Sequence, residues 1–370
     1  MKIAKIETHV LSIPEDEPLA NAPERDNAMR PVIAVTIRTD DGTDGIGLTF
    51  YGGALTKALD RAVQDLGALI IGDDPLRTEA TAAKLNAAAA GCEPGGIFTL
   101  ALSALDIALW DIKGKALGRP IVELLGGAVR DRMRVYSSNM FQFSIADTVA
   151  RARAAVDTGH TGVKFGWEPF GQDEKRDLAY VEAIRRAIGD DVDFMLDIGL
   201  AWDAKTTIRR AQLFQPYRLM WIEEPLHPDD YSGYGKVSAA CTQHIAAGEE
   251  ECTSVGFERL IDEGGIDIVQ IDLTRTGFTQ AMRIAAYAAS RGRKVCNHNF
   301  TTDINTAASL HFLCAIENAL VMEHCVEPGE ISRSLARAPV RIADGYAHLP
   351  DGSGLGVEPR EDIIAKYLVT

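Results

Sequence analysis

Eight short apolar runs at a regular spacing are the feature that most constrains how this chain can fold. They read MRVYSSN, TGVKFG, DFMLDIG, LMWIEEP, HIAAGEE, IDIVQIDLT, KVCNHNF and ALVMEHC, and helix-like segments separate them. Polar residues stand near their ends, in steps of 25, 33, 26, 26, 23, 26 and 25 residues, at Asn139, Lys164, Asp197, Glu223, Glu249, Asp272, His298 and Glu323. That period fits one strand, one loop and one helix per unit, so it predicts a closed parallel barrel over residues 126–340.

Residues 1–125 have a different texture, which indicates a separate α+β domain. IAKIETHVLSI and PVIAVTIRTDDGTDGIGLTF read as strands, and the DDGT turn divides the second into a hairpin. In ALSALDIALWDIKGKALG an apolar stripe at helical spacing is formed by Leu102, Leu105, Leu109 and Ile112. Asp111 and Lys115 are expected to pair one turn apart on the same helix. Residues 341–370 are expected to pack back on this domain.

Charge and composition narrow the classes of partner. The chain carries 53 acidic against 38 basic residues, a net charge of -15, and has no dense Lys/Arg run, which argues against nucleic acid and anionic membranes as partners. No run of eighteen apolar residues is present, and MKIAKIETHVLSIPED reads as a strand instead of a signal peptide, so a cytoplasmic protein is expected. Six scattered cysteines without a CxxC pair indicate reduced thiols, with neither disulfides nor a zinc site.

Three carboxylates stand at the ends of consecutive predicted strands, namely Asp197, Glu223 and Glu249. Neighbouring strands lie about 4.8 Å apart, so three such side chains at one end of a barrel converge on a small volume. Any one of them alone could be a loop acid or a helix cap, but three buried anions together need a cation. All-oxygen ligation favours Mg²⁺, with Mn²⁺ as the second choice.

The remaining strand ends indicate an acid–base site. His298 lies one strand beyond Asp272, and a carboxylate beside an imidazole fixes its tautomer and raises its basicity. Lys164 lies two strands before Glu223, on the flank opposite His298, where it is expected to act in catalysis or to bind a substrate carboxylate. Glu323 ends the last strand, where it could hydrogen-bond an enolate oxygen or cap a helix.

Together these groups fit abstraction of the proton α to a carboxylate. That proton is weakly acidic, so the resulting enediolate must be stabilised, and a metal on the carboxylate oxygens does this where charge develops. An adjacent acid can then expel a β-hydroxyl as water, or the proton can return on the opposite face. The expected partner is therefore a small-molecule carboxylate.

These motifs resemble those of the enolase superfamily, in its mandelate racemase subgroup, along essentially the whole chain. ALSALDIALWDIKGKALGRPIVELLGG is similar to the signature helix of the mandelate racemase and muconate lactonizing enzymes, and WIEEP and AAGEE are similar to their second and third metal-ligand segments. The resemblance implies an N-terminal α+β capping domain and a modified TIM barrel, (β/α)7β, that carries the chemistry. It assigns one Mg²⁺ per subunit to Asp197, Glu223 and Glu249, an acid–base dyad to His298 and Asp272, the substrate carboxylate to Glu323, the other flank to Lys164 and a supporting role to Glu224.

Two departures from the subgroup bear on the reaction. The subgroup often has Lys-x-Lys on the second barrel strand, whereas this chain reads VKFGW, with Gly166 where the second lysine would stand. This change weakens two-base racemisation and leaves His298 as the preferred base, unless Lys164 replaces the missing lysine. DIGLAW has Gly199 where many relatives place Asn. A polar substrate contact is then absent, or it is supplied by Asn297, Asn299 or Arg275.

The phrase EEPLHPDDYSGY is additionally similar to acid-sugar dehydratases of the rhamnonate type. We therefore expect a Mg-dependent hydro-lyase of carbohydrate-acid catabolism that dehydrates an aldonic or aldaric acid to a 2-keto-3-deoxy acid. Isomerase chemistry is the alternative, by a racemase, an epimerase or a sugar-lactone cycloisomerase. A non-catalytic sugar-acid binding protein is the second alternative, and the intact Lys164, Asp272 and His298 argue against it.

The resemblance also places substrate specificity on capping loops, here roughly residues 15–30 and 49–53. Tyr51 is the candidate substrate contact in the second of these loops. The same resemblance implies a homo-oligomer, either a dimer or an octamer.

Overall fold

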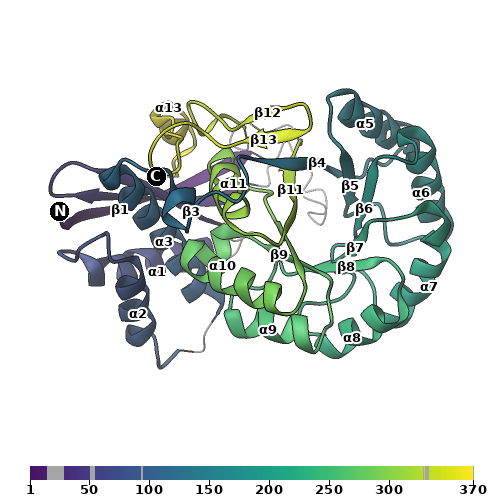
Figure 1. Ribbon diagram of the computed structural model, residues 1–370, viewed down its shortest axis with the longest axis horizontal. Coiled ribbons are helices and arrows are strands. Elements are labelled where there is room, and N and C mark those ends of the chain that lie inside the picture. Colours follow the sequence, from purple (N-terminus) through teal and green to yellow (C-terminus); the bar gives the residue numbers. More distant parts are fainter. Residues whose placement is uncertain (15–28, 51–54, 93–94, 328, 330–332, 370) are drawn as a thin grey trace.

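A computed structural model gives the fold (Figure 1); it describes residues 1–370 except 15–28, 51–54, 93–94, 328, 330–332 and 370. The N-terminal part contains an antiparallel sheet in the order β1 (Ile3–Pro14), β2 (Met29–Thr39) and β3 (Asp44–Phe50). The helices that follow it are α1 (Thr56–Ile70), α2 (Thr78–Ala88), α3 (Gly96–Leu117) and the short α4 (Ile121–Leu124). The predicted α+β capping domain is confirmed.

Helix α3 has the interior face that its sequence predicted. Leu105, Leu109 and Ile112 are buried against the sheet and α1, and Leu102 of the predicted stripe is partly buried beside them. Lys115 Nζ lies 2.9 Å from Asp111 Oδ2, so the expected pair one turn apart forms. Gly118 ends the helix in the left-handed conformation at φ 62°, a conformation that glycine adopts readily at helix ends.

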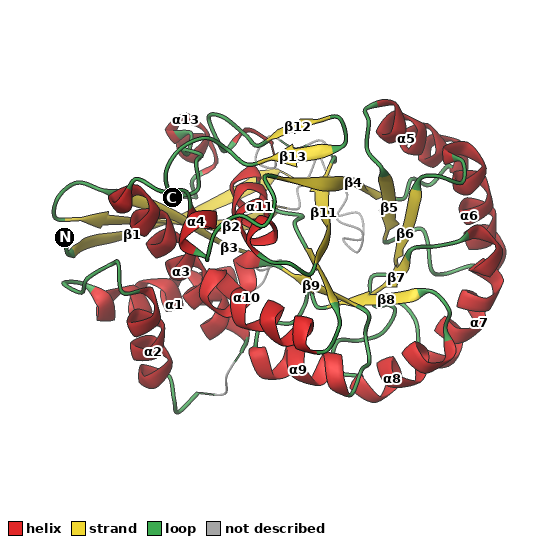
Figure 2. Ribbon diagram, in the orientation of Figure 1, coloured by secondary structure: helices red, strands yellow, loops and turns green. Residues whose placement is uncertain are grey.

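The second part is a closed barrel of eight parallel strands that alternate with helices along the chain (Figures 1 and 2). The strands are β4 (Arg132–Met140), β5 (Gly162–Gly166), β6 (Asp193–Asp197), β7 (Trp221–Glu223), β8 (His244–Ala247), β9 (Ile268–Ile271), β10 (Lys294–Asn297) and β11 (Ala319–Cys325). Strand β11 pairs in parallel with β4, for example Glu323 opposite Tyr136, which closes the barrel. The expected barrel is confirmed.

Within residues 132–325, all of which are described, seven α-helices link one barrel strand to the next, and a short 3₁₀ helix (Gln215–Tyr217) follows the third of them. The seven α-helices are α5 (Ile145–Asp157), α6 (Glu174–Ile188), α7 (Ala204–Phe214), α8 (Tyr231–Ala240), α9 (Ser254–Asp262), α10 (Leu273–Ser290) and α11 (Asp303–Ala315). Each of the seven begins after a Ser, Thr or Asp whose side chain accepts a hydrogen bond from a backbone N–H of the first turn. Such caps satisfy donors that the helix itself leaves free, so they set where each strand-to-helix loop ends.

The two parts are joined through α3 and α10, which pack against each other. Trp110 Nε1 on α3 donates to Thr279 Oγ1 on α10 at 2.9 Å, and the Asp106 carboxylate accepts from Thr279 N at 2.9 Å. The barrel mouth therefore has a fixed relation to the capping domain.

The C-terminal residues contact both parts. Strand β13 (Tyr346–His348) pairs with β4 and with β12 (Arg341–Ala343), and α13 (Glu361–Tyr367) follows. Beyond α13, Val369 N donates to Val10 O of β1 at 2.8 Å. The domain limits at residues 125 and 340 stay predictions from the sequence.

Cys92, Cys241, Cys252, Cys296 and Cys314 are free thiols. Among the described residues, no helix combines the length and apolar character that a membrane span requires.

Candidate active site at the barrel mouth

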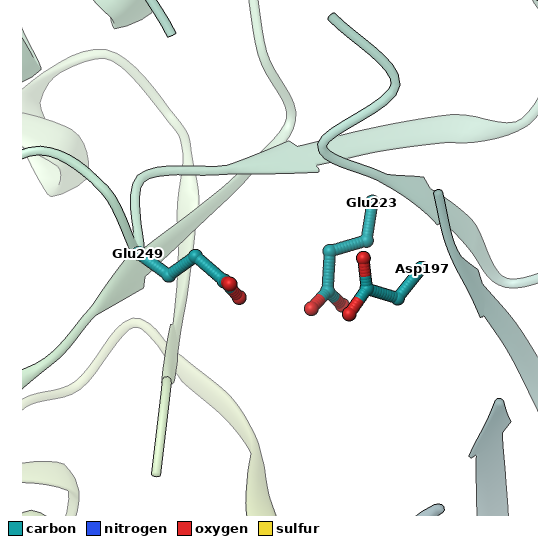
Figure 3. Close-up of side chains that lie close together, drawn as sticks. All are labelled: Asp197, Glu223 and Glu249. Carbon is teal, nitrogen blue, oxygen red and sulfur yellow. The ribbon is translucent and has the colours of Figure 1, made fainter. Parts of the chain in front are cut away.

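The three predicted metal ligands lie together at the C-terminal end of the barrel (Figure 3). Asp197 and Glu223 end the neighbouring strands β6 and β7 at matching positions, and Glu249 follows β8. Each residue offers a carboxylate oxygen, and these oxygens all lie within 4.8 Å of one another. All three side chains are buried.

The electrostatics of this cluster favour a cation. Burial and then the charge of Glu223 raise the pKa of Asp197 to about 7, and burial with the neighbouring carboxylates raises the pKa of Glu249 well above its usual value. Glu249 Oε2 is buried without a hydrogen-bond partner among the described residues. Buried anions at this density are unfavourable unless positive charge meets them, and an all-carboxylate set suits a hard divalent ion. The residues present therefore fit Mg²⁺.

Lys164 on β5 lies directly beside this cluster. Its Nζ forms an ion pair with Glu223 Oε1, lies 2.8 Å from Glu323 Oε1, and is 3.9 Å from Asp197 Oδ2. Burial lowers the pKa of Lys164, but the carboxylates of Glu223 and Glu323 outweigh this effect and raise it well above its usual value. Lys164 is therefore a charged lysine that contacts both a candidate metal ligand and the last barrel strand.

Both carboxylate oxygens of Glu323 on β11 have a polar partner. Its Oε2 accepts from Asn299 N at 2.6 Å, while Lys164 is paired with Oε1. Burial raises the pKa of Glu323, but the charges of Lys164 and His298 lower it further, to about 2. Glu323 is consequently an ionised acceptor at the barrel mouth.

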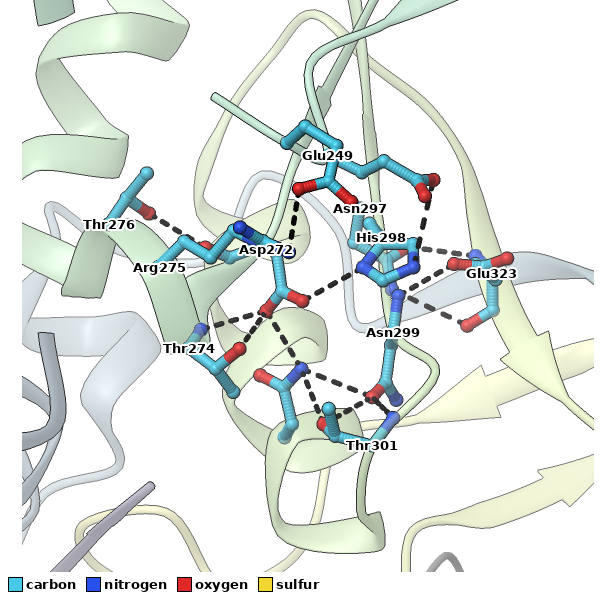
Figure 4. A network of polar contacts seen from close by, with 12 residues as sticks. Glu249, Asp272, Thr274, Arg275, Thr276, Asn297, His298, Asn299, Thr301 and Glu323 are labelled. Carbon is cyan, nitrogen blue, oxygen red and sulfur yellow. Dashed lines mark hydrogen bonds and ion pairs between the residues drawn. The ribbon is translucent and has the colours of Figure 1, made fainter. Parts of the chain in front are cut away.

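Asp272 serves both as a helix cap and as the partner of His298 (Figure 4). Its Oδ1 accepts from Thr274 N at 2.8 Å, from Thr274 Oγ1 at 2.8 Å and from Asn305 Nδ2 at 3.1 Å. Its Oδ2 lies 2.8 Å from His298 Nδ1. Burial raises the pKa of Asp272, but the hydrogen bond and charge of His298 lower it further, so the carboxylate is ionised.

His298 points its second ring nitrogen at the metal cluster. Nε2 lies 3.6 Å from Glu249 Oε2, and the ring is held from the other side by Asp272. Burial lowers the pKa of His298, but the Asp272 carboxylate raises it above the ordinary histidine value. A histidine with Nδ1 on a carboxylate and Nε2 directed into the site has the arrangement of a general base.

The four candidate substrate contacts have different surroundings. Asn297 is buried, with Oδ1 accepting from Glu323 N at 2.7 Å, and Asn299 is buried, with Nδ2 donating to Thr306 Oγ1 at 2.6 Å. Arg275, mostly buried at the start of α10, pairs with Glu250 Oε2 at 3.0 Å. Tyr51 lies outside the described residues, as do most of the capping-loop residues. A role in substrate binding stays a prediction for all four.

Two supporting residues were not singled out from the sequence. Trp221 Nε1 donates to Glu223 Oε2 at 2.8 Å, and the spacing of two residues along one strand, which puts both side chains on one face, could have indicated it. Asn305 reaches Asp272 from the first turn of α11, and no spacing in the sequence predicts that contact. Glu224 is buried, and its Oε1 accepts from Gly248 N at 3.1 Å.

Both glycines that depart from the subgroup pattern border the metal cluster. A Cβ atom added to Gly166 would lie 2.8 Å from Asp197 Oδ2, closer than side chains normally approach. A Cβ added to Gly199, which has φ +57°, would lie 2.8 Å from Trp167 Cε3. Position 166 therefore has no room for a side chain while Asp197 keeps its place.

Comparison with known proteins agrees with this architecture. Residues 6–126 match the mandelate racemase / muconate lactonizing enzyme N-terminal domain, and residues 147–363 match the enolase C-terminal domain-like family. A D-galactarolactone cycloisomerase of Agrobacterium fabrum is 32% identical over 99% of both chains. A D-galactonate dehydratase of Pectobacterium atrosepticum is 32% identical over 89% of this chain and 88% of its own.

A solved structure with a bound metal has the same fold. It is a racemase from Streptomyces coelicolor A3(2) with bound magnesium, 26% identical, with a TM-score of 0.91 over 99% of this chain and 100% of that one. The chain belongs to the mandelate racemase and muconate lactonizing enzyme family of the enolase superfamily.

Proposed function

We propose that this chain is an enzyme that removes the proton α to the carboxylate of an acid sugar and expels the oxygen on the β-carbon. The observation that carries the proposal is the position of His298, which is oriented by Asp272 and directs Nε2 toward three buried carboxylates. Relatives that cover most of the chain are named as a dehydratase and a cycloisomerase of acid sugars. A non-catalytic binding protein would not need this oriented base.

Asp197, Glu223 and Glu249 would hold one Mg²⁺ per subunit. When bound, the ion supplies positive charge at the substrate carboxylate, where negative charge develops as the α-proton leaves. The buried Oε2 of Glu249, which has no hydrogen-bond partner among the described residues, and the raised pKa of Asp197 support this assignment over a purely structural cluster.

His298 performs both proton transfers in the proposed reaction. Nε2 takes the α-proton, and Asp272 holds Nδ1–H and stabilises the imidazolium that forms. The electron pair of the C–H bond becomes the C=C bond, the C–O bond at the β-carbon breaks, and the leaving oxygen takes the proton back from Nε2. The enol product then tautomerises to a 2-keto-3-deoxy acid, so the overall reaction is a syn elimination of water.

The β5 side of the site supports elimination over racemisation. Racemisation or epimerisation by two bases needs a second proton acceptor opposite His298, and position 166 has no side chain to supply one. Lys164 is the cation on that side, and its Nζ is held by Glu223 and Glu323. We place Lys164 as a charge that pairs with Glu223, keeps Glu323 ionised and faces the substrate carboxylate, while Glu323 accepts hydrogen bonds from substrate hydroxyls.

A second candidate reaction differs in its leaving group alone. In a sugar lactone the β-oxygen can be a ring atom, so the same elimination opens the ring instead of releasing water. The cycloisomerase relative, which aligns over 99% of both chains, favours this candidate. The homo-oligomer and the cytoplasmic location stay predictions from the sequence.

Proton NMR of the purified protein with Mg²⁺ in D₂O tests the proposal. The panel contains aldonic acids, aldaric acids and their lactones. Loss of the α-proton with appearance of a 3-deoxy-2-keto product is expected for at least one of them. Deuterium exchange without elimination would instead indicate racemase or epimerase chemistry, and no change across the panel would contradict the proposed reaction for these acids.

A further inference from the structure

Trp167 stands at the barrel mouth, in the position that follows Gly166 at the end of β5. Its backbone φ is 66°, in the left-handed region that bulky residues rarely adopt. Such a conformation persists only where the surroundings impose it, and it is concentrated at functional sites. The strained backbone therefore makes the indole of Trp167 a candidate functional group.

The indole lies flat on Gly199. A Cβ atom built on Gly199 would lie 2.8 Å from Cε3, 2.9 Å from Cδ2 and 3.3 Å from Cε2 of Trp167. Cδ2 and Cε2 form the bond that the two rings share, and Cε3 is bonded to Cδ2, so Gly199 lies under the face of the indole and not at its edge. The absence of a side chain at position 199 is what lets the ring occupy this place.

This place borders the metal cluster. Gly199 N donates to Asp197 Oδ1 at 2.9 Å, and Trp167 N donates to Asp197 O at 3.3 Å. In the closed barrel β6 is four strands from β10 in either direction, so the Trp167 side of the mouth is opposite the end of β10, where His298 stands. The Trp167 residue remains partly exposed, although one face of its indole has packed on Gly199.

We infer that Trp167 is a flat platform that selects ring-shaped acid sugars, such as sugar lactones and anhydro-sugar acids, and this inference rests on the proposed function. A sugar ring presents a face of C–H groups, which an indole covers favourably. An open-chain sugar acid presents hydroxyls on both sides, and covering those without hydrogen bonds is unfavourable. The ring would lie between the indole and His298, with its α-proton toward Nε2.

Binding of two related probes tests the inference. D-Galactaro-1,4-lactone and open-chain galactarate share one carbon skeleton; ring closure joins O4 to C1 and removes one of the two carboxylates. Dissociation constants are measured by titration calorimetry with Mg²⁺ in the H298N background, which stops turnover. We expect the lactone to bind more tightly than galactarate before any change at position 167.

Removal of the platform should act on the lactone alone. W167A should weaken lactone binding about tenfold and galactarate binding by less than about twofold, whereas W167F, which keeps a flat ring, should retain lactone affinity within about threefold. The matched control is W110F, because Trp110 is a buried tryptophan whose Nε1 donates to Thr279 in the contact between α3 and α10, outside the loop that carries Trp167. W110F should change neither constant.

The outcomes separate a platform from a structural role. Damage to the fold would weaken both ligands alike, so equal losses in W167A would overturn the inference. Tighter binding of galactarate than of the lactone by the protein with Trp167 intact would also overturn the inference. Binding of neither probe would overturn it as well. If the intact protein transforms no acid of the NMR panel, the proposed function is wrong. If the intact protein turns over an acid of the panel but W167A leaves the ratio of lactone affinity to galactarate affinity unchanged, only the platform is rejected.

Discussion

The two sides of the barrel mouth are built in opposite ways. On the β9–β10 side, polar side chains hold one another in a network, with Asp272 fixed by Thr274 and Asn305 and in turn fixing His298 (Figure 4). On the β5–β6 side, Gly166 and Gly199 have no side chains; Asp197 occupies the space beside Gly166, and the indole of Trp167 covers Gly199. One side is arranged to move a proton, and the other is arranged to accept an apolar surface.

This difference explains how one fold can favour one reaction. Abstraction of the α-proton needs a base on one face of the substrate, and inversion of that carbon needs a base on each face. Because Asp197 occupies the space beside Gly166, the second base is excluded by the packing of a metal ligand as well as by the sequence. The side without a base is then free to serve recognition.

The largest effect should come from His298. H298N removes the only proposed base but keeps a hydrogen-bonding side chain, so we expect turnover in the NMR assay to fall by at least about 10³-fold. Mg²⁺ binding should persist within about threefold, because the three carboxylates are untouched.

A second His–Asp pair offers the matched control. His244 Nδ1 lies 3.7 Å from Asp267 Oδ2 at the N-terminal end of the barrel, and this histidine is exposed. H244N should leave turnover unchanged. Substantial activity in H298N would remove the β9–β10 side from the chemistry altogether.

Asp272 should have the next largest effect. D272N keeps the cap of α10 and the size of the side chain, but it no longer supplies negative charge to the imidazole at 2.8 Å. We expect a loss of about 10²-fold in kcat with little change in KM, because the base is misoriented while substrate contacts stay. A change confined to KM would indicate that Asp272 acts in binding instead.

The acidic and basic residues of the site could be predicted from the sequence because they stand at the ends of the predicted barrel strands. Asp197, Glu223 and Glu249 converge wherever eight parallel strands of this period close, and the register of β6 with β7 places Asp197 opposite Glu223. The pairing of His298 with Asp272 follows from the same geometry, since β9 and β10 are neighbours.

Contacts that depend on loop conformation and side-chain reach could not be predicted in this way. The sequence predicts the flank of the site on which Lys164 stands, but not that its long side chain reaches Glu223 and Glu323. Asn297 and Asn299 stay predicted substrate contacts, but the sequence does not indicate that Asn297 accepts from Glu323 N on β11 or that Asn299 donates to Thr306 on α11. Neither period nor composition encodes these choices, because they are set by packing between elements.

A side chain at position 166 should disturb the metal before it affects the base. In G166A the new methyl group would lie 2.8 Å from Asp197 Oδ2, so Asp197 must move, and we expect Mg²⁺ affinity to fall about tenfold by calorimetry. Gly91 is the control, because a Cβ there meets nothing within 4 Å. Unchanged Mg²⁺ affinity in G166A would show that the β5–β6 side tolerates a side chain, and the contrast between the two sides would then lose its steric basis.

The smallest effect should come from Trp221 on β7, a strand between the two sides of the barrel mouth. Trp221 Nε1 donates to Glu223 Oε2 at 2.8 Å, which leaves Oε1 as the oxygen that faces Lys164. W221F keeps the ring, which packs edge-on against Tyr136, but it removes the donor that orients this ligand. We expect a several-fold loss of Mg²⁺ affinity, at the lower end of the effect of residues that support metal ligands.

The control is W110F, which removes an equivalent hydrogen bond of a buried indole, 2.9 Å from Trp110 Nε1 to Thr279 Oγ1 in the contact between α3 and α10. W110F should change thermal stability without changing Mg²⁺ affinity. If both variants lose stability and neither loses Mg²⁺ affinity, then Glu223 is oriented by Lys164 alone. The support of this metal ligand then comes from β5 and not from Trp221 on β7.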